Sequence, residues 1–309
     1  MSVESYDVNA YAKINLFLRV CGTLPNGYHK LYTVMQEVDI ADDITMSFDD
    51  SCPEKITIKS GEGEALGDDN LCYIATDKFY AHLHKKCASK GENIKFPKTD
   101  IELTKRIPSQ AGMGGGSADA AAVLLVLQEH FGQPFSNEEM EKLALSCGAD
   151  VPFFLYGGTC LCEGVGEIVT PLKSLSGIDV LIVKPKEGVP TPACFKAIDS
   201  RNVVCNPDKY AEYVEALSGD GEYENSKAAL DAFIAGEELL VNDLQSPAVE
   251  IVPQISKIIE TLEGKGAEHC AMTGSGSAVF ALFDDEAKAR DAAADVKFNG
   301  CDVFVTKTI

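Results

Sequence analysis

The stretch PSQAGMGGGSADAAA, residues 108–122, places four glycines in the five positions from Gly112 to Gly116, directly before a run of alanine and leucine. Glycine reaches positive φ at little cost and lets the backbone approach a ligand closely. Residues 118–127 favour a helix, with Ser117 available as its N-cap, and residues 101–107 alternate like a strand. The order strand, glycine loop, helix points backbone N–H groups and a positive helix dipole at an anion, most often phosphate.

The loop differs from the two common nucleotide-binding patterns. A P-loop needs Gly-Lys followed by Ser or Thr, but Gly264-Lys265 is followed by Gly266. The dinucleotide pattern G-x-G-x-x-G fails because Ser117 occupies its last position. A glycine-rich turn without a ligand is the alternative. It is disfavoured because four glycines lose much backbone entropy on folding and have no side chains to pack.

Length and charge limit the class of protein. A chain of 309 residues suggests two domains of about 150 residues each, and a hydrophobic content of 45% suffices for buried cores. The net charge of −21 argues against nucleic acid and an anionic membrane as partners. A phosphorylated ligand must then be held locally, by glycine amides and a few lysines. With no signal-peptide pattern at the start and no apolar stretch of about 20 residues, we expect a cytoplasmic protein, or a stromal one if a plastid transit peptide is absent from this chain.

The eleven cysteines follow no framework spacing, so reduced thiols are expected. Cys160 and Cys162 should face one side of a strand as small buried residues. His82, His84 and Cys87 lie on a predicted helix, where residues two apart point in different directions. We therefore expect no protein-bound metal there.

Strand-like and helix-like segments alternate, which predicts an α+β fold with two domains, residues 1–161 and 162–309, whose last strand could return to the first domain. The spacing predicts strands at 11–21, 30–38, 44–48, 101–107, 153–163, 167–171 and 180–184, and two more within 264–283. It predicts helices at 70–87 after the cap Asp69-Asn70, from the glycine loop to 131, at 136–147 with the capping box Ser136 to Glu139, and at 191–198, 209–217, 227–235, 247–263 and 285–296, with a loop at 218–226.

Two further segments carry candidate catalytic residues. Asp150 stands in Gly148-Ala-Asp-Val-Pro152, where the proline imposes a non-helical backbone. A carboxylate on such a turn can accept a proton, although a lone Asp at this place is more often a cap or a solvated residue. Lys13 and Asn15 share one face of an apolar strand, which a site explains better than packing does. A lysine near Asp150 would stabilise the carboxylate and a developing alkoxide.

Several motifs carry a family resemblance. The glycine loop resembles the phosphate loop of the GHMP small-molecule kinases, which include galactokinase, homoserine kinase, mevalonate kinase and phosphomevalonate kinase. Within that superfamily the chain is similar to the 4-diphosphocytidyl-2-C-methyl-D-erythritol kinases of the non-mevalonate isoprenoid precursor pathway. The motifs that carry the closer resemblance are Ala12-Lys-Ile-Asn-Leu16, Asn26-Gly-Tyr-His29, Gly148-Ala-Asp-Val-Pro152, Glu163-Gly-Val-Gly-Glu-Ile168, Pro190-Thr-Pro192 with Phe195-Lys196, Asn242-Asp-Leu244 with Pro247, and Gly274-Ser-Gly276.

The resemblance implies ATP-dependent phosphorylation of the 2-hydroxyl of a substrate that carries a cytidine diphosphate group, with Mg²⁺ arriving on ATP and no metal ligand assigned in the protein. It also implies an N-terminal domain like domain 2 of ribosomal protein S5 and a ferredoxin-like C-terminal domain. The catalytic pair would be Lys13 and Asp150. Substrate-binding residues would be Asn15, Tyr28, His29, Thr191 and Phe195. ATP-binding residues would be Asn70, Lys105, Pro108, Ser109, Gln110, Ala111, Gly112, Met113, Gly114, Gly115, Gly116, Ser117 and Ala118.

Two alternatives stay open at this point. One is another GHMP-type kinase, acting on mevalonate, homoserine or a sugar. The other is a non-catalytic relative that binds nucleotide. The second glycine cluster, Gly274 and Gly276, either approaches substrate phosphates or forms a tight turn. Ala118 departs from the family pattern, which often has a second serine there.

Overall fold

The computed structural model describes residues 3–199, 201, 205, 207–210, 214, 217, 226–235, 241–295 and 300–309, and the chain divides into two compact units. Unit 1 holds residues 3–11, 40–107 and 114–155. Unit 2 holds residues 12–39, 108–113 and the described residues from 156 onward. Two long strands, β1 (Glu4–Thr23) and β2 (His29–Asp49), contribute residues to both. The mixture of helices and sheets confirms the α+β class.

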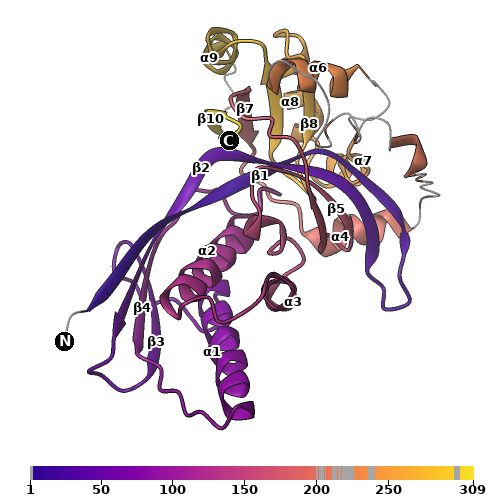
Figure 1. The fold of residues 1–309 in the computed structure, drawn as a ribbon. Helices are drawn as coiled ribbons and strands as arrows, with labels where there is room; N and C mark the ends of the chain where they lie inside the picture. Colours follow the sequence, from indigo (N-terminus) through magenta and orange to yellow (C-terminus); the bar gives the residue numbers. More distant parts are fainter. Residues whose placement is uncertain are drawn as a thin grey trace. The chain divides into compact units, whose positions relative to one another are not determined.

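Unit 1 combines three helices with a small group of strands (Figure 1). Residues 43–49 of β2 pair antiparallel with β4 (Lys98–Thr104), and β3 (Lys55–Ser60) pairs parallel with β4. The helices α1 (Leu71–Ser89) and α2 (Gly115–His130) pack on each other, and α3 (Asn137–Cys147) contacts both. A short 3₁₀ turn, Phe153–Leu155, follows.

The helix starts at α1 and α3 agree with the sequence signals. Asn70 caps α1, its side-chain oxygen accepting from the Cys72 backbone N–H at 2.9 Å. At α3 both halves of the predicted capping box form, because Ser136 and Glu139 each accept from the other's backbone N–H. Each cap satisfies backbone donors that the first helical turn leaves unpaired.

The start of α2 differs from the prediction that Ser117 is its N-cap. Gly114 is the N-cap, with a left-handed φ of 73°, and the helix begins at Gly115. Glycine adopts this conformation without strain, so the loop can enter the helix two residues before the serine. Ser117 therefore lies in the first turn of the helix. Buried residues occupy every face of α2 after that turn, as expected for a helix enclosed by other elements.

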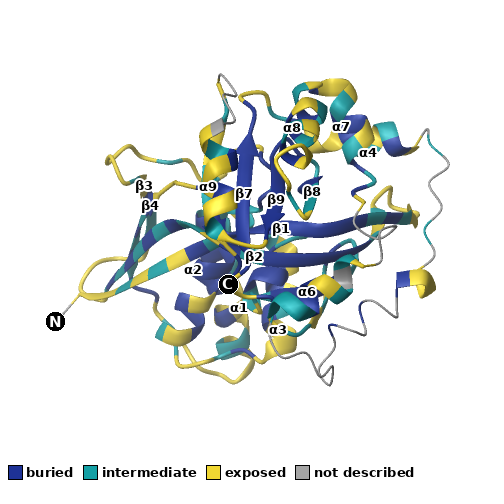
Figure 2. Ribbon diagram, turned by 90° about the horizontal axis from the view of Figure 1, so that it is seen from above, coloured by how far each residue is buried: buried dark blue, intermediate teal, exposed yellow. Residues whose placement is uncertain are grey.

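Unit 2 is built around a four-stranded antiparallel sheet with the order β10 (Asp302–Lys307), β7 (Asp179–Lys184), β9 (Val279–Phe283) and β8 (His269–Met272). Every residue of the two central strands is buried (Figure 2), and helices from both halves of the unit complete the core. Residues 31–36 of β2 pair separately with β5 (Thr159–Gly164), which pairs with β6 (Ile168–Pro171). The elements of the unit are β5 (Thr159–Gly164), β6 (Ile168–Pro171), β7 (Asp179–Lys184), α4 (Thr191–Asp199), α6 (Ser226–Ile234), α7 (Gln245–Ile251), α8 (Gln254–Glu263), β8 (His269–Met272), β9 (Val279–Phe283), α9 (Glu286–Asp295) and β10 (Asp302–Lys307).

Other differences from the predicted elements have local causes. The two strands predicted at 30–38 and 44–48 form one strand, because the acidic segment between them keeps an extended backbone. The helix predicted at 247–263 is two helices, since Pro253 has no N–H to continue α7. The strand predicted from residue 153 begins at Thr159, after the 3₁₀ turn. Strand β3 was not predicted. The last strand, β10, was expected without bounds and could have returned to the first domain, but it pairs with β7 in unit 2.

The cysteines contain one departure from the expected reduced thiols. Cys21 and Cys205 form a disulfide, with Cα atoms 4.7 Å apart. Nothing in their separation of 184 residues signals this pairing, because it depends on the fold bringing them together. The other nine are thiols, and Cys160 and Cys162 are buried as predicted. Two predictions fall largely outside the described residues. Of the predicted loop 218–226, only residue 226 is described. Of the helix predicted at 209–217, only residues 209, 210, 214 and 217 are described.

Candidate active site

Lys13 and Asn15 form a buried polar pair on β1 in unit 2, which confirms that they share one face of the strand. The Lys13 ammonium donates to Asn15 Oδ1 at 2.6 Å and to the Gly112 carbonyl at 2.8 Å. Only about 2% of Lys13 and 1% of Asn15 is exposed. Asn15 Nδ2 donates to Thr33 Oγ1 at 2.9 Å, which fixes the orientation of its amide. The pair therefore presents a lysine whose position is set by several hydrogen bonds.

Gly112 of the first glycine cluster and Gly274 of the second lie against each other in unit 2. A Cβ on Gly112 would overlap the Thr273 carbonyl oxygen, and one on Gly274 would lie 2.7 Å from the Gly112 carbonyl oxygen. The Gly274 N–H also donates to Asn15 Oδ1 at 2.9 Å. Close approach of two backbones, in addition to a turn, explains why both positions are glycine. Asn242 supports this contact by donating to the Met272 and Gly274 carbonyls.

The remaining glycines of the loop belong to unit 1 and form the start of α2. The N–H groups of the first helical turn have no partner within the helix, so this end favours an anion. A Cβ on Gly115 would lie 3.0 Å from an Ile107 methyl carbon and 3.3 Å from Lys105 Nζ. Lys105 therefore places its ammonium directly beside the first residue of the helix.

Lys105 is held by two carboxylates that the sequence analysis did not identify. Its ammonium donates to Asp42 and, at 2.6 Å, to Asp119 Oδ2. Burial lowers the pKa of Lys105, but the two carboxylates outweigh burial and the pKa is raised. Burial, with Asp42 acting in the same direction and Lys105 against it, raises the pKa of Asp119 to about 7. No local pattern marked Asp42, because its partner lies 63 positions away in the chain.

Asp150 lies in the turn that follows α3, and it is half-buried. The Val151 N–H donates to the Gly148 carbonyl at 3.2 Å, which closes the turn. A Cβ on Gly148 would lie 3.9 Å from Ser117 Oγ. The structure therefore brings the Gly148–Asp150 turn next to the first turn of α2, both within unit 1. Lys13 and Asp150 fall in different units, and their pairing stays a prediction.

His29 and Phe195 meet in unit 2. Their rings stack with centroids 4.9 Å apart and planes 27° from parallel. His29 Nε2 lies 2.7 Å from Asp199 Oδ1, a partner that sequence reasoning missed. The spacing of Phe195 and Asp199 offered a signal, because residues four apart share a helix face. Tyr28 is 60% exposed, and Thr191 shares a hydrogen bond of 2.7 Å with Ser275.

The remaining predicted residues have plain structural places. Asn70 is the cap of α1, with its side-chain oxygen engaged by the backbone. Ala111 and Met113 are buried, and their carbonyls accept from Ala278 and Lys13 N–H groups. Gln110 has a φ of 50°, and a Cβ on Gly188 would overlap its side chain. Pro108 is half-buried and Ser109 is exposed. Gly116 lies in the first turn of α2, and Ala118 is buried within that helix.

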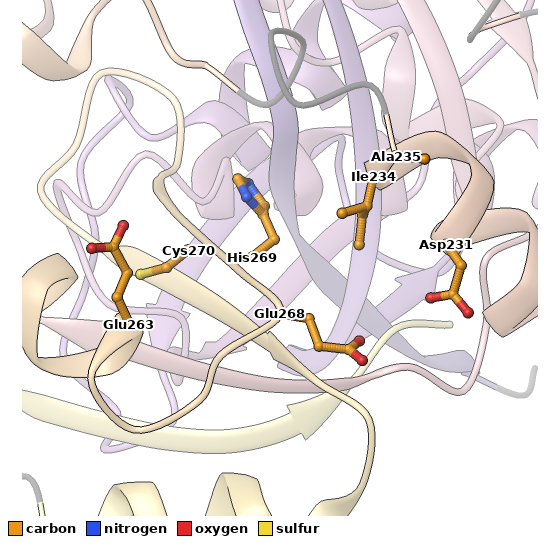
Figure 3. A pocket seen from close by; sticks show the side chains of 7 residues that line it. All are labelled: Asp231, Ile234, Ala235, Glu263, Glu268, His269 and Cys270. Carbon is orange, nitrogen blue, oxygen red and sulfur yellow. The ribbon is translucent and has the colours of Figure 1, made fainter.

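A cavity of about 530 Å³ lies elsewhere in unit 2 and contains none of the predicted site residues. Figure 3 shows Glu263 and Cys270 on one side of it and Asp231 and Ile234 on the other. His269 also lines it, and burial lowers the pKa of this imidazole to about 4. The described residues contain no group of three or more His, Cys, Asp or Glu that could hold a metal ion. They also contain no helix long and apolar enough to cross a membrane.

Comparison with known proteins places these features in a class. A family model for the GHMP kinases N terminal domain matches residues 73–158, and one for the GHMP kinases C terminal domain matches residues 226–300. A homoserine kinase from Cytophaga hutchinsonii, 21% identical with a TM-score of 0.69 over 99% of this chain and 97% of its own, shares the fold. The chain is thus a member of the GHMP kinases, which are small-molecule kinases.

Two relatives define the branch. A 4-diphosphocytidyl-2-C-methyl-D-erythritol kinase from Clostridium beijerinckii is 36% identical over 307 residues, which is 98% of this chain and 99% of the relative. The crystal structure of a 4-(cytidine 5′-diphospho)-2C-methyl-D-erythritol kinase is 30% identical, with a TM-score of 0.73 over 98% of this chain and 99% of its own. This chain belongs to the 4-diphosphocytidyl-2-C-methyl-D-erythritol kinase family, as the sequence motifs predicted.

Proposed function

We propose that this chain transfers the γ-phosphoryl group of ATP to the 2-hydroxyl of 4-diphosphocytidyl-2-C-methyl-D-erythritol, a step of the non-mevalonate route to isoprenoid precursors. The observation that carries the proposal is the full-length similarity to kinases of this name, at 36% identity over 98% of the chain. The buried Lys13–Asn15 pair, hydrogen-bonded to the glycine loop, supports it, since a merely structural strand would gain little by burying a lysine.

The nucleotide phosphates bind, in this proposal, along residues 108–118. The free N–H groups at the start of α2 and the nearby Lys105 ammonium supply the local positive charge that the acidic chain lacks overall. Asn70 and Lys105 lie toward the adenosine end. Mg²⁺ would arrive with the triphosphate, where it would neutralise part of the charge on the phosphate oxygens.

Asp150 accepts or orients the proton of the acceptor hydroxyl, and Lys13 stabilises the alkoxide that develops there. Phosphoryl transfer requires positioning and charge stabilisation more than covalent chemistry from the protein. Lys13 meets the positioning requirement, because Asn15 and the Gly112 carbonyl fix its ammonium. The short turn that carries Asp150 provides a comparable constraint beside α2.

The cytidine group is recognised by Tyr28, His29 and Phe195, with Asn15 and Thr191 contacting the rest of the acceptor. Aromatic rings provide stacking for any base, and His29 provides a hydrogen bond to the pyrimidine edge. The position of His29 against Phe195, with Asp199 on its Nε2, supports a preset orientation of the imidazole.

The finer fold labels belong to the proposal as well. In unit 2 the order β7, helices, β8, β9, α9, β10 follows the β-α-β-β-α-β pattern of a ferredoxin-like domain. We assign that fold to residues 162–309 and the fold of domain 2 of ribosomal protein S5 to residues 1–161.

The test is a steady-state assay of the purified protein with ATP and a panel of alcohols: the diphosphocytidyl substrate, mevalonate, homoserine and galactose. We expect turnover with the first alone and competition by CDP. Turnover with another alcohol, and indifference to CDP, would assign a different GHMP activity. Absence of any transfer from labelled ATP in a single-turnover incubation would indicate a non-catalytic relative.

Asp150→Asn gives the sharpest check on mechanism. It keeps the shape of the side chain and removes the base, so kcat should fall by about 10²-fold or more. The KM for ATP should change little, because the phosphate loop is untouched. Near-native turnover by the variant would exclude Asp150 from proton transfer.

A further inference from the structure

The Asp42 carboxylate is fully buried in unit 1, and its contacts define how β4 leaves the sheet. One of its oxygens accepts from the backbone N–H groups of Arg106 and Ile107, the latter at 2.8 Å. Its other oxygen accepts from the Lys105 ammonium. Asp42 thus accepts hydrogen bonds from three consecutive residues, Lys105 to Ile107, and it fixes the chain just before the glycine loop.

Asp119 is the second carboxylate on Lys105, and its contacts are incomplete. It lies in the first turns of α2 and is 3% exposed. Its Oδ2 accepts from Lys105 at 2.6 Å, but among the described residues no donor reaches its buried Oδ1, and the neighbouring Asp42 carboxylate favours protonation of Asp119. Leaving a buried carboxylate oxygen unsatisfied costs free energy, so this residue is not explained by stability alone.

The lysine that these carboxylates hold stands beside the predicted phosphate-binding turn. Lys105 Nζ would lie 3.3 Å from a Cβ on Gly115, the first residue of α2. Two of its three N–H donors are used by Asp42 and Asp119. Its side chain is 43% exposed, so the third donor is accessible to a ligand.

Asp119 can affect a bound phosphate in two ways, through its own negative charge and through the position it gives the Lys105 ammonium. One ammonium between two ionised carboxylates carries a net negative charge, which would repel phosphate. The raised pKa of Asp119 reduces that charge near neutral pH, because burial and Asp42 favour its protonated form. What remains is the geometric effect, since a carboxyl group accepts from Lys105 through its Oδ2 in either protonation state.

We propose that Asp119 is a positioning residue that, together with Asp42, aims the Lys105 ammonium at the nucleotide bound by the glycine loop. This inference rests on the proposed kinase function. It adds that Asp119 acts through Lys105, contacts no substrate itself, and improves nucleotide affinity by fixing the position of the ammonium.

A double-mutant cycle tests the proposal by calorimetric titration with a non-hydrolysable β,γ-imido analogue of ATP. Lys105→Gln, which keeps hydrogen-bond donors and removes the charge, should weaken the analogue by about 10- to 100-fold. Asp119→Ala should weaken it about fivefold or more in the native background, and less than about twofold in the Lys105→Gln background, because coupled residues do not add. The affinity for CDP should not change in any variant.

Asp119→Asn is the conservative variant, and it keeps an oxygen acceptor for Lys105. The affinity of this variant for the analogue should stay within about threefold of the native affinity. The exposed pair Glu138 and Lys142 on α3 provides a matched control, because Lys142→Gln should change neither affinity. Thermal melting checks that each variant is folded. If Asp119→Ala does not fold, Asp119→Asn and Lys105→Gln still test the proposal.

Three outcomes would overturn the proposal. Tighter binding of the analogue by Asp119→Ala would mean that its charge repels phosphate and that its geometry contributes nothing. Additive effects of the two substitutions would mean that Asp119 does not act through Lys105. Equal losses for the analogue and for CDP would indicate a general loss of structure. If instead the native protein transfers no phosphoryl group to the diphosphocytidyl substrate, the proposed function fails, and the cycle still reports on nucleotide binding.

Discussion

Lys105 in unit 1 and Lys13 in unit 2 are both held by oxygen atoms beside a glycine loop, but the oxygens belong to carboxylates at Lys105 and to an amide and a backbone carbonyl at Lys13. Lys105 donates to two buried carboxylates, Asp42 and Asp119. Lys13 donates to an amide oxygen two residues away and to a backbone carbonyl. Replacing Lys105 therefore leaves buried charges without their cation, whereas these two contacts of Lys13 leave only neutral acceptors.

The difference separates two tasks. Carboxylate partners fix an ammonium firmly, which suits the proposed contact of Lys105 with an anionic nucleotide. The amide and backbone oxygens that accept from Lys13 fix its ammonium and add no charge of their own, which suits the proposed stabilisation of a developing alkoxide. We therefore expect substitutions at Lys105 to act on nucleotide affinity and substitutions at Lys13 to act on the chemical step.

Lys13→Met gives the largest expected effect on this comparison. It should lower kcat by about 10²-fold or more, because an interaction made mainly in the transition state is lost. The affinity for the imido analogue of ATP should stay within about threefold of native. Steady-state kinetics and calorimetry on the same preparation separate the two quantities. A loss of analogue affinity with unchanged kcat would assign Lys13 to the nucleotide and would remove the distinction between the two lysines.

Phe195→Ala tests whether unit 2 also carries affinity for the cytidine group. Stacking contributes about 1–3 kcal/mol per base, so the KM for the diphosphocytidyl substrate should rise by about tenfold to a hundredfold. The KM for ATP should not change. Phe195→Leu, which keeps apolar packing against the unit 2 core but has no aromatic ring, is the matched control for core damage and should lose most of the same affinity. A raised KM for ATP alone would mean that the two ligands had been assigned to the wrong residues.

The part of the site that could be predicted is the part encoded locally. The Lys13–Asn15 face follows from the two-residue period of a strand, and the caps of α1 and α3 follow from residues within one turn of the helix start. The family motifs added the role assignments and the full-length likeness.

The part that could not be predicted depends on pairs far apart in the sequence. Asp42 lies in an acidic segment that favoured a break in β2, yet it is buried because Lys105, Arg106 and Ile107 return to meet it. Cys21 and Cys205 are a second such pair. Strand β3 was missed, and β10 was given no bounds, because only one residue of six is buried in each and the sequence signal of a buried strand face is therefore weak.

The two halves of the glycine loop should respond differently to an added methyl group. Gly112→Ala would force a φ of 75° on alanine and overlap the Thr273 carbonyl, and neither backbone can move away cheaply. We expect a loss of about 2 kcal/mol or more in the free energy of unfolding. Gly115→Ala meets the side chains of Ile107 and Lys105, which can adjust, so it should cost about 1 kcal/mol or less while weakening the ATP analogue. Denaturant unfolding and calorimetry give both quantities. Equal stability losses at the two glycines would contradict the division of the loop into a packed half and a ligand-facing half.

The smallest expected effect compares one buried titratable group from each unit, because their pKa shifts have opposite consequences. Asp119 has its pKa raised from 3.8 to about 7, so between these values the native protein holds a proton that the unfolded chain has released, and stability falls as pH rises. His269 has its pKa lowered from 6.5 to about 4, so between these values the unfolded chain binds a proton that the native protein does not, and stability falls as pH drops. In the Asp119→Asn variant, the free energy of unfolding should therefore decline less as the pH rises toward 7. His269→Phe, which keeps the ring contact with Phe280, should flatten the decline toward pH 4, by about 1–2 kcal/mol at pH 5. Urea unfolding from pH 4 to pH 8 measures both slopes. Parallel pH profiles for the native protein and either variant would show that the group in question does not titrate as its burial requires.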